Sequence, residues 1–208
     1  MRVIALEAAT SRCSVAFVDD RRGHSAARAF EARGNLSRAL VPALAALEAE
    51  TWPVASADLL VVDGGPGSFT GLRVALAAAK GLAFVTSRPL VAVTSLKVIA
   101  AAAASTGGVV AFLDARGGLF YYAVYSRRAG DWEETVAPAL GPWGDVAALP
   151  ADVYAGPEPP PGGAEGANWL EAWPDAATLA TLGVREFELG GPADVASLRP
   201  LYLKRGQV

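Results

Sequence analysis

The sequence contains a single cysteine, Cys13, and a single histidine, His24, among 208 residues. One thiol cannot form a disulfide within the chain, and one thiol with one imidazole cannot supply the usual ligands of a zinc site. A Ser-His-Asp triad would need His24 as its base, but this residue follows a charged turn, where we expect a solvated side chain. We therefore predict neither a metal site nor a hydrolytic triad.

Positive charge is also scarce, and nearly all of it is arginine, because the only lysines are Lys80, Lys97 and Lys204. The net charge is −3 and the isoelectric point is about 5.2. Proteins that bind nucleic acid without a partner neutralise its phosphates with lysine and arginine side chains. The charge balance therefore opposes such a function.

Long hydrophobic runs are scarce as well. The N-terminal segment carries Glu7 and has no long apolar stretch, so it does not resemble a signal peptide. The alanine-rich run at 98–104 is far too short to cross a bilayer. Together with the single cysteine, these features indicate a cytoplasmic protein without a membrane partner.

The most distinctive segment present is GGPGSFTG at residues 64–71, between an apolar run at 59–62 and a helix-like stretch at 72–84. A strand, a glycine turn and a helix N-terminus direct free N–H groups and the helix dipole at a bound anion. However, Leu72 rather than lysine follows Gly71, so the segment is not a P-loop. Gly65 and Gly67 match the first two glycines of a dinucleotide-binding loop, but Gly71 comes one residue too late to be the third. An anion site and a purely structural turn both remain open.

Acidic residues end three of the expected strands, namely Glu7, Asp63 and Asp114. They either hold a metal–nucleotide ligand or cap turns and helices. The residues expected at an anion or nucleotide site are Gly65, Gly67, Ser68, Thr70, Glu7 and Asp114. Ser68 and Thr70 lack a neighbouring base, so neither is expected to act as a nucleophile.

Hydrophobic periodicity predicts the order β-β-β-α-β-α-β up to residue 93, an antiparallel meander that leads into a parallel sheet. A second, smaller α/β unit begins near residue 100. It is expected to contain a helix at 174–182 and a strand-like run at 187–189. We predict an N-terminal domain at 1–104, a C-terminal domain at 105–190 and a tail at 191–208 that packs back on the first domain.

The two helices of the first domain each carry one apolar stripe. Leucines recur at helical spacing from Leu36, and the stripe from Leu72 to Ala79 has unusually small side chains. Small residues let helices approach closely, so we expect this stripe to face a neighbouring helix.

The segment GGPGSFTGLRVALAAAKGLA resembles the signature segment of the bacterial TsaB (YeaZ) family. The N-terminal ALEAATSRCSVAF resembles that family's first hairpin, LVAVTSL its following strand, and LDARGG the opening of its second domain. The similarity extends over nearly the whole chain.

This resemblance implies an α/β fold of the actin-like ATPase type, as in acetate and sugar kinases, with two α/β units that each hold a mixed sheet. It also implies a part in forming threonylcarbamoyladenosine in tRNAs that read codons beginning with A. TsaB is the non-catalytic partner of TsaD, and TsaE, an ATPase, joins them. The chain is thus expected to have no catalytic residue and no cofactor of its own, with ATP bound by the complex and tRNA contacted indirectly.

In that family the two N-terminal helices form the contact with TsaD or with a second TsaB. The interface residues expected from this are Leu36, Leu40, Leu44, Leu72, Arg73, Ala75, Leu76 and Ala79. A glutamate at Ala75 or Ala79 is accordingly expected to break a homodimer. Arg38 replaces a carboxylate usual on the first helix, Glu7 replaces an aspartate, and Leu119 replaces a common glutamate.

Two other functions, a stand-alone kinase or ATPase and a peptidase, are alternatives. A stand-alone kinase or ATPase of the same fold would use a glycine in the first hairpin turn, where this chain has Ala8 and Ala9. A glycoprotease-like peptidase would need groups that the chain lacks, including the histidine pair that TsaD-like chains carry on their first helix.

Overall fold

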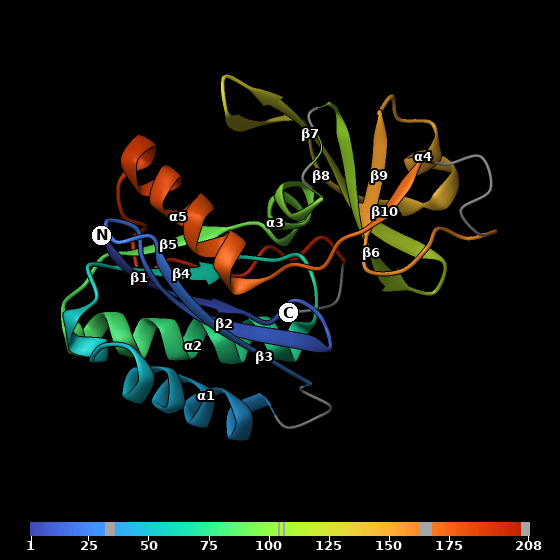
Figure 1. The fold of residues 1–208 in the computed structure, drawn as a ribbon. Coiled ribbons are helices and arrows are strands. Elements are labelled where there is room, and N and C mark those ends of the chain that lie inside the picture. The colour runs from blue at the N-terminus through green and yellow to red at the C-terminus, as the bar shows by residue number, and fades with distance from the viewer. Residues whose placement is uncertain (32–35, 104, 106, 163–167, 205–208) are drawn as a thin grey trace. The chain divides into compact units, whose positions relative to one another are not determined.

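The structure, a computed structural model, describes residues 1–31, 36–103, 105, 107–162 and 168–204. It forms two compact units (Figure 1). Unit 1 comprises Met1–Thr94 and Asp175–Leu201, and unit 2 comprises Ser95–Pro174 and the described residues from Tyr202 onward.

Unit 1 contains a five-stranded sheet in the order β3-β2-β1-β4-β5. Strands β1 (Arg2–Glu7), β2 (Arg12–Asp19) and β3 (His24–Glu31) form the antiparallel meander, and β4 (Leu59–Asp63) and β5 (Leu90–Val93) continue it in parallel with β1. The order of elements predicted up to residue 93 is confirmed.

Three helices cover this sheet on its two faces. Helices α1 (Leu36–Glu50) and α2 (Phe69–Thr86) pack on one face, and α5 (Ala176–Gly190) packs on the other (Figure 1). A single 3₁₀ turn, η1 (Val54–Ser56), precedes β4. Because both faces are covered, β4 is buried along its whole length, as its continuous apolar run requires.

The strand-like run expected at 187–189 is wrong, since these residues form the last turns of α5. Three residues are too few to separate a period of 2 from a period of 3.6. Helix α5 begins at Asp175, whose carboxylate accepts hydrogen bonds of 2.9 Å from the N–H groups of Ala177 and Thr178.

Unit 2 contains a second five-stranded mixed sheet, in the order β10-β9-β6-β7-β8. Helix α3 packs on β6 and β7, and α4 packs on β7 and β8. The elements are α3 (Ser95–Ala102), β6 (Val109–Arg116), β7 (Leu119–Arg128), β8 (Asp131–Pro142), α4 (Trp143–Ala147), β9 (Val153–Gly156) and β10 (Trp169–Glu171). Strands β8, β9 and β10 were not predicted.

The compact units divide the chain differently from the predicted domains. Helix α3, expected in the first domain, belongs to unit 2, and α5, expected in the second, belongs to unit 1. Within the predicted tail, the N–H of Ala193 donates to the Leu90 carbonyl and that of Leu201 to the Gly64 carbonyl, both at 2.8 Å. Residues 191–201 therefore pack on unit 1, and 205–208 lie outside the described residues.

Helix α2 is also long and apolar enough to span a bilayer when judged by length and composition alone. In the structure its inner side is buried against β1 and β4, and a third of its residues (33%) are buried. One side of α2 therefore packs on the sheet of its own unit, while other residues of the helix are exposed.

Candidate functional site

Two carboxylates meet where the parallel strands β1 and β4 end. Leu6 and Val62 are paired in register, so Glu7 and Asp63 follow at the same edge of the sheet. Ligands bind at this edge in open α/β sheets. Both side chains are buried, however, with exposed fractions of 0% and 1%.

Hydrogen bonds hold Glu7 in this buried position. Its Oε1 accepts from the Ala9 N–H at 2.7 Å, and its Oε2 accepts from the Ser14 hydroxyl at 3.4 Å. The Ser14 oxygen in turn accepts from the N–H of Ala176 at 2.9 Å, in the first turn of α5. The carboxyl thus joins the first hairpin to α5.

Burial raises the pKa of the Glu7 carboxyl well above its usual range, and the neighbouring Asp63 raises that pKa further. The hydrogen bonds from Ala9 and Ser14 lower the pKa but do not outweigh burial. The folded chain therefore keeps a proton on Glu7 to a higher pH than the unfolded chain does.

Replacing Glu7 by glutamine should consequently change how stability depends on pH. As pH rises from about 4.5 toward the raised pKa, the folded wild type binds more protons than the unfolded chain, so its free energy of unfolding falls. Glu7→Gln removes that fall and should stabilise the protein at neutral pH by about 1–2 kcal/mol.

Urea unfolding at pH 5 and pH 7.5 measures this effect. The matched control is Glu158→Gln, on an exposed carboxylate, which should leave the pH dependence unchanged. A Glu7→Gln protein as pH-dependent as the wild type would show that Glu7 does not hold the proton.

The glycine loop follows Asp63, and hydrogen bonds within the chain occupy several of its backbone donors. The Gly65 N–H donates to Asp63 Oδ1 at 2.7 Å and the Ser68 N–H to the Ala9 carbonyl at 2.7 Å. At the N-cap of α2, the Gly71 N–H donates to the Ser68 hydroxyl at 3.2 Å. These donors are therefore turned toward the protein and not toward a ligand.

Close packing explains why the loop needs glycine. A Cβ on Gly67 would lie 2.5 Å from the Ala9 carbonyl oxygen, and a Cβ on Gly71 would overlap the Ala8 carbonyl oxygen. The loop therefore rests on the Ala8–Ala9 turn of the first hairpin, with no gap between them. The contacts favour the structural interpretation of the glycine segment.

Two other residues predicted for an anion site are exposed. Thr70 is exposed in the first turn of α2, and Asp114 is exposed in unit 2, where it accepts from the Arg116 N–H at 2.7 Å. Among the described residues, no group of three His, Cys, Asp or Glu side chains could hold a metal ion. Burial raises the pKa of the Cys13 thiol to about 12, which makes it unreactive.

All but one of the predicted interface residues are buried inside unit 1 in the chain by itself, and their part in an interface stays a prediction. The exception is Arg73, which is exposed and whose guanidinium carbon lies 3.7 Å from the Phe69 ring centroid. The buried residues are Leu36, Leu40, Leu44, Leu72, Ala75, Leu76 and Ala79. The small side chains of α2 let this helix lie close to the sheet of its own unit.

A different face of α1 and α2, which sequence reasoning missed, points outward. We call it the outer face and define it by Arg38, Val41 and Ala45 on α1 and by Ala77, Gly81, Phe84 and Val85 on α2. Three of its apolar side chains are largely exposed, at 62% for Val41, 86% for Phe84 and 80% for Val85. Exposed apolar groups gathered on two neighbouring helices are typical of an interaction surface.

Gly81 adds a more specific signal to the outer face. A glycine inside a helix costs about 1 kcal/mol relative to alanine. Among the described residues nothing requires glycine here, because a Cβ on Gly81 would meet none of their atoms within 4 Å. Together with exposed Ala77 one turn earlier, it leaves a shallow strip where another backbone could approach closely.

Comparisons with known proteins agree on tRNA threonylcarbamoyladenosine biosynthesis. Residues 31–169 match the family described as TsaD, tRNA N6-adenosine threonylcarbamoyltransferase. The TsaB protein of Escherichia coli, described as a tRNA threonylcarbamoyladenosine biosynthesis protein, is 32% identical over 93% of this chain and 82% of its own length. The Bacillus subtilis protein of the same name is 38% identical over 37% of this chain and 34% of its own.

Among solved structures, YeaZ from Pseudomonas aeruginosa superposes with a TM-score of 0.83 and 27% identity, covering 97% of this chain and 99% of that one. The two mixed sheets and this match confirm the predicted fold class, an α/β fold of the actin-like ATPase type. The family suggested by the glycine segment is confirmed as well.

Proposed function

The chain belongs to the TsaB (YeaZ) family and takes part in tRNA threonylcarbamoyladenosine biosynthesis, and we propose that it does so as a non-catalytic subunit. Its partner is a TsaD-type catalytic subunit, which a TsaE-type ATPase joins. ATP is bound by the complex and not by this chain alone. The subunit works in the cytoplasm and contacts tRNA only secondarily, in keeping with its net charge of −3.

The main observation behind this proposal is the unfilled space beside Gly81 on the outer face. A glycine inside a helix is destabilising, and at Gly81 the described residues leave its space open, so a contact with another molecule would explain it. A helix of a related subunit fits, because small residues permit close packing of two helices. In the absence of a TsaD-type partner, the same face pairs with a second copy of the chain.

The buried acids at the strand ends support the non-catalytic role. Glu7 and Asp63 occupy the position of a ligand site in this class of fold, but they are enclosed by the glycine loop and the Ala8–Ala9 turn. A substrate could reach them only if the loop were displaced. Chemistry at this edge would therefore have to come from the partner's equivalent site.

Reconstitution tests the proposal. A TsaD-type subunit, a TsaE-type ATPase, tRNA, ATP, bicarbonate and threonine are combined with and without this chain, and modified adenosine is measured by mass spectrometry of digested tRNA. We expect modification to fall to background without the chain. Full modification in its absence would contradict the proposal, as would tight ATP binding with turnover by the isolated chain, which would favour a stand-alone kinase or ATPase.

A further inference from the structure

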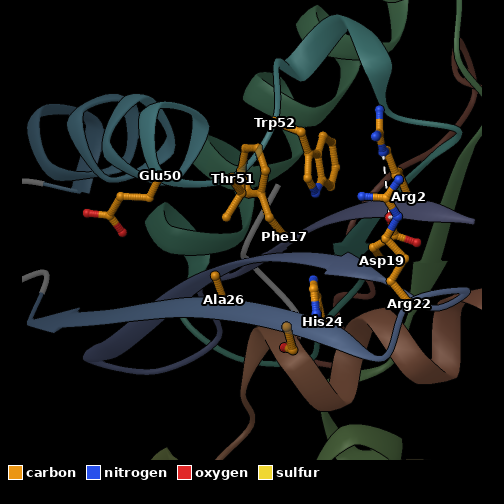
Figure 2. Close-up of a pocket in the computed structure, with 10 residues that line it drawn as sticks. Arg2, Phe17, Asp19, Arg22, His24, Ala26, Glu50, Thr51 and Trp52 are labelled. Carbon is orange, nitrogen blue, oxygen red and sulfur yellow. Dashed lines mark ion pairs between the residues drawn. The ribbon is translucent and has the colours of Figure 1, made fainter.

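A separate cavity of about 230 Å³ lies in unit 1 at the start of β3, between this strand and the residues that follow α1 (Figure 2). Phe17 and Trp52 form its apolar wall, with their ring centroids 4.7 Å apart. Phe17 is buried in the core of unit 1, so this wall is fixed by packing. The cavity does not include the outer face or the glycine loop.

Two arginines, Arg2 and Arg22, and two acids, Asp19 and Glu50, line the polar wall of the cavity. Asp19 Oδ2 lies 3.7 Å from Arg2 Nε and 3.8 Å from Arg22 Nε, so one carboxylate serves two guanidinium groups. Both distances are too long for hydrogen bonds. Glu50, the other acid at the cavity, is paired with Arg28.

Hydrogen-bond donors in this wall are left for a ligand. Within the described part of the chain, neither the Arg2 nor the Arg22 guanidinium donates a hydrogen bond, and the His24 imidazole has no partner. Figure 2 shows Arg2 and Arg22 beside Asp19, and His24 extending from β3 toward Phe17 and Trp52. Two guanidinium groups that share one carboxylate, and one imidazole, thus line the cavity together with the apolar wall.

We propose that this cavity binds a small organic oxyanion, a phosphate or carboxylate on an apolar body. The planar fork of an arginine matches both kinds of oxyanion with paired hydrogen bonds. Arg2 is held in advance, since its guanidinium carbon lies 5.7 Å from the Trp52 ring centroid, which reduces the entropy lost on binding. The apolar body lies against Phe17 and Trp52, while Arg22 and His24 close over the oxyanion.

The experiment titrates phenyl phosphate into the full chain and follows His24 by NMR. Because His24 is the only histidine, its imidazole C–H signals are unambiguous. We expect saturable shifts with a Kd near or below about 1 mM. Benzoate tests the carboxylate alternative, and whichever of the two anions binds more tightly identifies the preferred oxyanion.

Two variants that each remove one positive charge distinguish specific binding in the cavity from non-specific electrostatic attraction to the surface. Arg22→Gln should weaken phenyl phosphate binding about tenfold. Arg21→Gln removes the same charge from the neighbouring exposed residue, which does not line the cavity, and should leave Kd within about twofold. Phenol should not bind, and inorganic phosphate should bind more weakly than phenyl phosphate.

Several results would overturn the proposal. These are the absence of saturation by either anion up to about 10 mM, equal losses in Arg21→Gln and Arg22→Gln, and phenol binding as tightly as phenyl phosphate. Binding of an RNA oligonucleotide without any response to the small anions would also overturn it. The result for this cavity is independent of the reconstitution with TsaD.

Discussion

Gly71→Ala is expected to lower the free energy of unfolding by about 3 kcal/mol or more. The new methyl group would overlap the Ala8 carbonyl oxygen, which belongs to backbone and cannot rotate away. The Ala8–Ala9 turn is itself fixed, because Ala9 donates to Glu7 and accepts from Ser68. Relief requires moving α2 away from the sheet, which would expose part of the core of unit 1.

Gly81→Ala is the matched control for this prediction. It makes the same substitution ten residues later in the same helix, where a Cβ would meet no atom within 4 Å. It should raise the free energy of unfolding by about 0.5–1 kcal/mol through helix propensity alone. Urea unfolding of both variants measures the two effects, and a destabilisation of equal size in both would show that close packing at Gly71 is not the cause.

The order of elements in unit 1 could be predicted because each element has a clear period. Leucines from Leu36 onward mark the buried side of α1, and the continuous apolar run of β4 marks a strand covered on both faces. Strand β8 could not be predicted in the same way. It contains Pro138 and Pro142 and is largely exposed, so neither alternation nor an apolar run distinguishes it from a loop.

The candidate site was only partly predictable, because periodicity identifies a buried face but not the element that covers it. The stripe containing Ala75 and Ala79 was predicted to be a contact face, and in the structure it packs within unit 1. Similarly, GGPGSFTG predicted a tight turn, but its contact with Ala8 and Ala9 is made across about 60 residues of sequence. Folding alone brings such segments together.

The open side of α2 could have been found from one signal. Gly81 and Ala77 are small residues at a spacing of four on the side opposite Ala75 and Ala79. Small residues on both sides of one helix predict two close contacts, one with its own sheet and one with another molecule. This arrangement separates the folding function of the helix from its proposed pairing function, and the two can be tested independently.

Ala79→Glu and Ala77→Glu should therefore fail in different ways. Ala79 is fully buried, so a glutamate there places an unpaired charge in the core and should lower the free energy of unfolding by about 3–5 kcal/mol. Ala77 is exposed, so a glutamate there should change that free energy by no more than about 0.5 kcal/mol. On the outer face, however, it should weaken association with the TsaD-type partner about tenfold or more, because the charge would be desolvated in the contact.

Urea unfolding and sedimentation velocity, with and without the partner, separate the two outcomes. The expected pattern is a destabilised Ala79→Glu chain and a stably folded Ala77→Glu chain that sediments as a monomer and does not restore tRNA modification. If the Ala79→Glu chain folds stably and has lost only its association, the buried stripe that contains Ala79 would be part of the interface after all. Undiminished association of Ala77→Glu would remove the outer face of α2 from the pairing surface.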